Sequence, residues 1–173
     1  MARHTRGRHK KFGGAVLAAV LLLAARPGFA AEDEANHPKI PRFVSLDAEK
    51  VNLRTGPGQR YPIDWVLTRR DMPVEVIAQF ENWRRIREWD GTTGWAQQNL
   101  LTGKRHVVVA KGDSRPIHRQ PDPNSALAAR AEPGVIARLT ECREAWCRIE
   151  TASVANWMRR TDLWNVYPDE KVP

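Results

Sequence analysis

Short runs of alternating hydrophobic and polar residues, separated by tight turn signals, follow one another along most of this chain. In the strand that begins at Val51, this residue and Leu53 share one face, while Asn52 and Arg54 share the other. Residues 74–80 are the clearest strand, because they are rich in β-branched side chains. The pattern predicts an all-β protein made of short strands and hairpins.

Five or six such strands fill the first folded unit. Glu81-Asn82 and Asp90-Gly91 supply hairpin turns between the later ones. Short strands joined by tight turns are typical of small barrels and not of helical domains. The strands are expected at residues 41–46, 51–54, 65–67, 74–80, 83–89 and 92–96.

A constrained loop follows the Val51 strand. Pro57 fixes φ, and Gly56 and Gly58 on either side of it can adopt positive φ, so a tight irregular loop is expected. Tyr61-Pro62 then returns the chain to an extended form. The pattern Asn-Leu-Arg-x-Gly-Pro-x-x-x-Tyr-Pro resembles the opening of bacterial SH3-like domains. That resemblance implies a small, strongly bent β-barrel.

The same arrangement returns about 64 residues later, which indicates an internal duplication. The offset of the matched positions is 64 at the start of the two copies and 62 or 63 further along. We further expect Pro73–Val76 to correspond to Pro133–Ile136 at an offset of 60, which would shorten the first loop of the second copy. The matched pairs are Leu53/Ile117, Pro57/Pro121, Trp83/Trp146, Ile86/Ile149, Trp95/Trp157 and Leu100/Leu163.

The second copy departs from the motif, because Pro116–Pro121 replaces Asn-Leu-Arg-x-Gly-Pro and no Tyr-Pro follows. Its close, Asn156–Pro168, resembles the end of a group of exported proteobacterial proteins with tandem SH3-like units. The resemblance covers about residues 42–170 and implies two SH3-like barrels in tandem, the second one degenerate. The expected boundaries are a signal peptide at 1–30, a flexible lead-in at 31–40, the two domains at 41–103 and 104–168, and a tail at 169–173.

The N-terminal residues have the composition of a secretory signal peptide. A basic start precedes an uncharged apolar run at Ala15–Ala25, and Gly28-Phe29-Ala30 offers a cleavage site. An apolar run of eleven residues is too short to span a membrane, so no stable membrane insertion is expected after cleavage. We therefore expect a periplasmic or secreted protein.

Removal of that segment changes the charge of the chain. The whole sequence carries +8, but residues 1–30 hold six basic residues and no acid, which leaves the remainder at +2. A nucleic-acid partner is therefore not expected.

Cys142 and Cys147 are the only cysteines, and an even pair in an exported protein predicts a disulfide. We expect Arg143–Trp146 to form a loop longer than the Glu81-Asn82 hairpin, with its register fixed by the disulfide. A redox or metal pair is the alternative. Two thiols cannot complete a zinc site alone, and the spacing is not that of a Cys-x-x-Cys motif.

Seven tryptophans need an explanation in a chain of this size. If Ile86 points into the barrel, strand alternation turns Trp83 and Trp89 outward. Two interpretations stay open: the rings cover the barrel ends or the contact between units, or they form a ligand platform with interleaved arginines. By analogy with SH3-type grooves, the candidate binding residues are Arg54, Tyr61, Trp65, Trp83, Trp95 and Asn99.

Reactive groups are sparse, and we expect neither a catalytic residue nor a metal or cofactor site. The histidines beyond the signal segment, His37, His106 and His118, stand apart from one another. The favoured hypothesis is a non-catalytic binding module of the cell envelope that recognises cell-wall peptides or an envelope protein. The alternatives are an accessory subunit of a cell-wall hydrolase and a purely structural envelope protein. Oligomeric state does not follow from the sequence.

Overall fold

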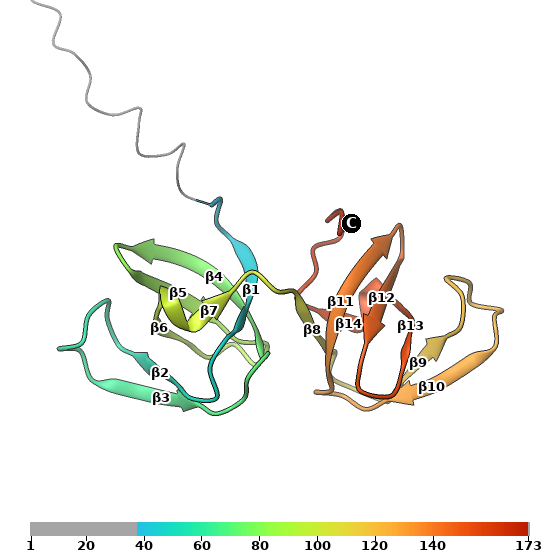
Figure 1. Ribbon diagram of the computed structural model, residues 1–173, viewed down its shortest axis with the longest axis horizontal. Helices are drawn as coiled ribbons and strands as arrows, with labels where there is room; N and C mark the ends of the chain where they lie inside the picture. The colour runs from blue at the N-terminus through green and yellow to red at the C-terminus, as the bar shows by residue number, and fades with distance from the viewer. Residues whose placement is uncertain (1–37, 173) are drawn as a thin grey trace, which may run out of the picture. The chain divides into compact units, whose positions relative to one another are not determined.

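The computed structural model describes residues 38–172, which consist of short strands and two 3₁₀ turns (Figure 1). This confirms the predicted all-β class, whereas the predicted signal peptide and residues 31–37 of the lead-in lie outside the described residues. The first half contains β1 (Arg42–Leu46), β2 (Val51–Arg54), β3 (Ile63–Leu67), β4 (Pro73–Phe80), β5 (Trp83–Arg87), β6 (Thr93–Gln97), η1 (Gln98–Leu100) and β7 (Leu101–Thr102). The second contains β8 (His106–Val109), β9 (Arg115–His118), β10 (Leu127–Ala131), β11 (Ile136–Arg143), β12 (Trp146–Glu150), β13 (Ala155–Arg159), η2 (Arg160–Asp162) and β14 (Leu163–Trp164).

The two halves repeat one topology. The first sheet has the strand order β3-β2-β6-β5-β4-β1-β7, and the second has the matching order β10-β9-β13-β12-β11-β8-β14. Both sheets carry a register shift at the same place in the long hairpin, Val76/Ala78 in one and Leu139/Glu141 in the other. Two small SH3-like β-domains in tandem, as the duplication predicted, are thus present.

The structure corrects two details of the sequence alignment of the halves. β11 begins 63 residues after β4, so the expected offset of 60 for Pro73–Val76 is wrong, and the loops between β2 and β3 and between β9 and β10 have equal length. β7 begins with Leu101 and β14 with Leu163, so Leu101, and not Leu100, is the counterpart of Leu163. The expected offset of 60 aligned Pro73 with Pro133 because the two segments have similar residues. The strand register instead aligns Pro73 with Ile136.

The strand β2 shows why the motif folds as it does. Val51 and Leu53 are fully buried, whereas Asn52 and Arg54 on the other face are half-buried. In the loop that follows, a Cβ on Gly56 would lie 2.4 Å from the Tyr61 ring, so only glycine lets that ring fold back over the loop.

Each domain has its own hydrophobic core. The first is built around Leu46, Leu53 and Ile86, which are fully buried, and the second around Ile149 and Met158. Inward positions of successive strands thus meet in one cluster per domain, as alternation requires.

The disulfide Cys142–Cys147 is confirmed, but its setting differs from the expected one. The β11–β12 turn contains two residues, like the β4–β5 turn, so the predicted longer loop is wrong. Cys142 lies directly opposite Cys147 in the ladder. The first residue of each turn, Glu81 or Glu144, has a positive φ of 46° or 47°. The bond therefore ties two facing strands and does not span an enlarged loop.

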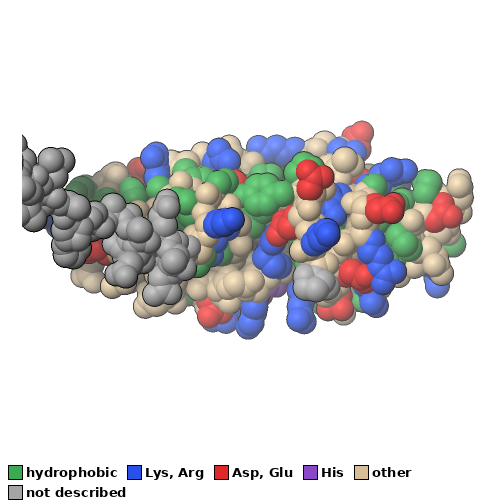
Figure 2. Space-filling model, turned by 90° about the horizontal axis from the view of Figure 1, so that it is seen from above, with side chains coloured by type: hydrophobic (Ala, Val, Ile, Leu, Met, Phe, Trp, Pro, Cys, Tyr) green, Lys and Arg blue, Asp and Glu red, His purple; other side chains and the backbone are tan. Residues whose placement is uncertain are grey.

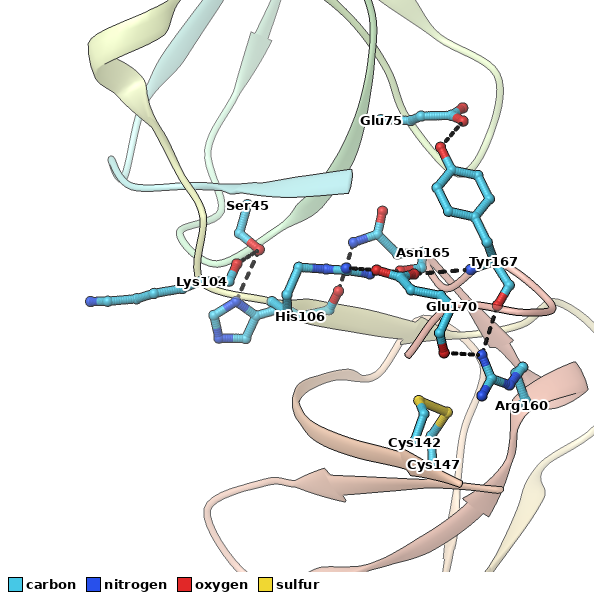
Figure 3. A network of polar contacts seen from close by, with 11 residues as sticks. Ser45, Glu75, Lys104, His106, Cys142, Cys147, Arg160, Asn165, Tyr167 and Glu170 are labelled. Carbon is cyan, nitrogen blue, oxygen red and sulfur yellow. Dashed lines mark hydrogen bonds and ion pairs between the residues drawn. A yellow bond between two sulfur atoms is a disulfide. The ribbon is translucent and has the colours of Figure 1, made fainter. Parts of the chain in front are cut away.

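Residues 38–172 belong to one compact unit, in which the domains contact each other through specific side chains. Val108 of β8 joins the core of the first domain. Phe43 of β1 stacks on Tyr167 with ring centroids 4.3 Å apart. The Tyr167 hydroxyl donates a 2.8 Å hydrogen bond to Glu75, which is buried in the first domain (Figure 3).

Two further findings concern the C-terminal end and the membrane. Val172 packs against the second core, so the expected tail at 169–173 is part of the fold as far as Val172. Within residues 38–172, no helix has the length and apolar character needed to cross a bilayer.

Candidate functional site

Two neighbouring clefts lie on the first domain. The larger has a volume of about 640 Å³, and we call it the arginine cleft. The smaller has a volume of about 110 Å³. Gln97, at the end of β6, lines both. The arginine cleft is lined by Arg42, Val44, Asn82, Arg84, Gln97, Gln98, Asn99, Leu101, Thr102 and Gly103, and the small cleft by Lys50, Asn52, Arg54, Gln59, Trp83, Gln97 and Leu100.

The small cleft contains two of the candidate residues, Arg54 and Trp83. The Arg54 guanidinium donates a 2.7 Å hydrogen bond from Nη1 to the Tyr61 carbonyl, so it holds the end of the long loop. Trp83 lies on the outward face of β5, as expected, but is only 9% exposed. An open platform at Trp83 is therefore wrong, and its ring forms a wall of the cleft.

The other candidate residues do not converge on this cleft. Trp95 is half-buried and pairs across the ladder with Arg54. Tyr61 packs over Gly56 and Gly58. Asn99 is exposed and lines the arginine cleft.

Trp65 stands apart from both clefts. It is 55% exposed on β3, the end strand of the first sheet, where Ile63 and Val66 are also exposed. The Trp65 ring is therefore available for contact with another molecule over a wide area, whereas Trp83 offers only the small part of its ring that lines the cleft.

Two arginines that the sequence reasoning missed dominate the larger cleft. Arg84 of β5 shares the inward face of Ile86 and is 5% exposed. Its Nη1 donates to the carbonyls of Glu81 and Trp83 at 2.7 and 2.8 Å, and its Nη2 donates to the Gln98 side chain. A charged residue at an inward position of a strand was the available sequence signal.

The charge in this cleft is not neutralised by protein groups. Burial lowers the pKa of Arg42, and burial together with the Arg42 charge lowers the pKa of Arg84. The Nε atoms of both are buried without a hydrogen-bond partner. Among residues 38–172, neither arginine forms an ion pair, and no carboxylate lines the cleft. One buried and one half-buried guanidinium group in a cleft without a carboxylate favour an anionic ligand.

The corresponding surface of the second domain is closed by its own side chains. Trp146, the counterpart of Trp83, is 7% exposed, with Arg159 stacked over its ring at 5.0 Å. His118, the counterpart of Arg54, meets the same ring edge-on at 5.2 Å. His118 thus contacts the tryptophan ring of the second domain, whereas Arg54 of the first domain holds the Tyr61 carbonyl.

The titratable groups elsewhere serve packing. His106 Nδ1 lies 3.0 Å from Ser45 Oγ, and burial lowers its pKa (Figure 3). Burial also raises the pKa of Glu88 to about 7, with a smaller contribution from the Asp90 charge. In the part of the chain that the structure describes, no three His, Cys, Asp or Glu side chains are placed to hold a metal ion. His37 lies outside that part.

The charged surface is mixed in sign. On the face seen in Figure 2, Lys and Arg side chains alternate with Asp and Glu side chains. This mixture of charges on one face agrees with the near-balanced charge of the sequence beyond residue 30.

Comparison with solved structures returns proteins of low identity. NlpC2 from Trichomonas vaginalis is 10% identical with a TM-score of 0.35, and the match covers 78% of this chain and 52% of that one. An NlpC/P60 family protein from Bacillus cereus is 13% identical with a TM-score of 0.32, and the match covers 76% and 58%. The chain thus spans about half the length of these structures, and the likeness is too low to transfer an activity. No curated protein matches the chain.

The family comparison agrees with the topology. The model of the bacterial SH3 domain matches residues 47–103 and 111–165, one match in each half of the structure. These segments contain β2–β7 and β9–β14 with their shared strand order. The chain therefore belongs to the bacterial SH3 domain family and carries two copies of the domain in tandem.

Proposed function

We propose that this protein is a non-catalytic binding module of the cell envelope, whose first SH3 domain holds cell-wall peptides or an envelope protein. The observation that carries the proposal is the pair of adjoining clefts on that domain, which share Gln97. Their walls combine arginines, side-chain amides and one tryptophan edge. Such groups contact peptides through hydrogen bonds and stacking.

The state of the reactive residues supports a binding role. Both cysteines are used in the disulfide, and His106 and His118 are buried in packing contacts. The bacterial SH3 domains and the disulfide are consistent with a location outside the cytoplasm. The proposed exported state rests on the signal-peptide pattern of residues 1–30.

The experiment is retention of the purified protein on isolated cell-wall sacculi, measured by co-sedimentation. Gln97→Ala combined with Asn99→Ala removes amide groups from the clefts, and we expect retention to fall by about tenfold. Thr161→Ala is the matched control, because it is an exposed residue at the position of Asn99 in the second domain. If the wild-type protein is not retained and captures no envelope protein, the proposal fails.

The exposed edge strand favours one alternative, an accessory subunit that binds a cell-wall hydrolase. Ile63, Trp65 and Val66 are 46%, 55% and 43% exposed on the end strand β3. A strand that pairs on one side only and carries exposed apolar side chains suits addition of a strand from a partner. Cross-linking in cells, with and without Trp65→Ala, tests this alternative, and loss of one specific cross-linked hydrolase would support it. A zymogram of the purified protein checks that it does not cleave cell wall by itself.

A further inference from the structure

The second domain binds a peptide segment of its own chain at the surface that corresponds to the arginine cleft. Arg160 of η2 donates from Nη1 to the carbonyls of Tyr167 and Glu170 at 2.7 and 2.9 Å (Figure 3). The amide of Cys142 in β11 donates to the Val172 carbonyl at 3.0 Å. Residues 167–172 are thus held through their backbone carbonyls against η2 and β11.

A carboxylate of that segment is held by a second arginine. Glu170 accepts hydrogen bonds from Arg105, which also donates to the Asn165 carbonyl at 2.6 Å. The Arg105 and Glu170 side chains are 19% and 20% exposed, so the ion pair is largely removed from water. The contact therefore combines backbone hydrogen bonds with one charge-assisted pair.

Strand register makes Arg42 the counterpart of Arg105. Arg42 pairs with Val76 of β4, and the Arg105 carbonyl accepts a hydrogen bond from Leu139 of β11, which follows Val76 by 63 residues. Arg84 is likewise the counterpart of Cys147. The first domain thus has the carboxylate-binding arginine of the second and adds another guanidinium where the second has its disulfide.

The arginine that holds the segment's carboxylate in the second domain has a counterpart without such a contact in the first. Among residues 38–172, Arg42 forms no ion pair, and its Nε atom is buried without a hydrogen-bond partner. The exposed Gln98 side chain, at the position of Arg160, lends its oxygen to Arg84, as a ligand carboxylate oxygen would. The 640 Å³ volume of the cleft is of the size that pockets for small ligands have.

We propose that the arginine cleft binds a short peptide through a free carboxylate placed between Arg42 and Arg84. The side-chain amides of Asn82, Gln97 and Asn99 would then take the ligand's peptide groups. The inference rests on the proposed binding function and names the ligand chemistry that the second domain displays with its own chain. Peptides of the cell wall and acidic segments of envelope proteins share this chemistry, and the experiment separates them.

The binding test uses the purified protein and isothermal titration with three probes. These are soluble cell-wall peptides released from sacculi, the same peptides with their carboxylates amidated, and the synthetic peptide acetyl-Ala-Glu-Ala-amide. We expect the first and third to bind, and amidation to weaken binding of the first at least about tenfold. Raised salt should weaken binding, because the contact is between charges.

Substitutions of single arginines test where the ligand's carboxylate binds. Arg42→Gln and Arg84→Gln should each weaken binding about tenfold. Arg85→Gln is the matched control, because Arg85 is the exposed neighbour on the opposite face of β5 and loses the same charge. Arg42→Gln should keep the melting temperature of the wild type, because it removes a partly buried charge that has no ion-pair partner. This variant therefore decides the test if Arg84→Gln does not fold.

The outcomes distinguish the two proposals. If sacculi retain the protein but amidation and Arg42→Gln change nothing, the carboxylate inference is overturned while the binding function stands. If the acidic peptide binds through Arg42 but sacculi and their peptides do not, the carboxylate site stands and the cell-wall source is rejected. If Arg85→Gln weakens binding as much as Arg42→Gln, the effect is one of net charge and the site is rejected.

Discussion

Glu88 should make the protein less stable as pH rises from about 4.5 to about 7. The side chain follows β5, is 8% exposed, and forms no ion pair within residues 38–172. Burial raises the pKa of its carboxyl from 4.5 to about 7. In this window the folded state binds more protons than the unfolded state, so the free energy of unfolding falls with rising pH.

The magnitude follows from the pKa difference. A tenfold change in proton affinity corresponds to about 1.4 kcal/mol, so ionisation of Glu88 in the folded protein costs about 3 kcal/mol. Below pH 4.5 the residue is protonated in both states and contributes nothing. Glu88→Gln resembles the protonated form at every pH. Its gain in stability should therefore grow from near zero at pH 4.5 to about 3 kcal/mol at pH 8.

The assay is urea unfolding of the wild type and Glu88→Gln between pH 4.5 and 8, followed by tryptophan fluorescence. His106 acts in the opposite direction, because its lowered pKa disfavours the charged form in the folded state, but subtraction of the two curves removes its contribution. Glu132→Gln, a change of an exposed carboxylate, serves as the control and should parallel the wild type. Parallel curves for Glu88→Gln and the wild type would refute the reasoning.

Three further changes test the packing. Replacing both Cys142 and Cys147 by alanine should lower stability by about 2 kcal/mol, the value for so short a ring, and reductant should then have no added effect in urea unfolding. Tyr167→Phe removes the hydrogen bond to a buried glutamate of the first domain and should cost about 1–2 kcal/mol by the same measurement. Gly56→Ala forces a Cβ against the Tyr61 ring and should lower the melting temperature through about 1–3 kcal/mol of strain, whereas Gly103→Ala, with open space around it, should not.

Several features could be predicted from the sequence because they depend on local alternation. Val51 and Leu53 are buried while Asn52 and Arg54 face outward, since side chains of a strand alternate. The duplication was visible in matched Trp and Ile residues at nearly constant spacing, because both copies bury the same positions. The disulfide followed from the cysteine count.

Other features could not be predicted because they depend on which strands become neighbours. Trp83 faces outward by its place in β5, yet neighbouring groups leave only 9% of it exposed. Strand alternation predicts the direction of a side chain and not how far its neighbours bury it. The predicted offset between β4 and β11 was wrong for a related reason. Equivalent positions are fixed by the pairing of strands in the ladder and not by similarity of residues.

By itself, the sequence determined the all-β class, the tandem repeat and the disulfide, because period, spacing and composition are properties of the chain. Only the tertiary structure placed Arg42 and Arg84, 42 residues apart along the chain, on the walls of one cleft without a carboxylate. It also decided that the Glu170 carboxylate binds Arg105, the counterpart of Arg42 in the second domain. Charge in a folded protein acts through distance and burial, which pairing of distant strands sets and local sequence does not.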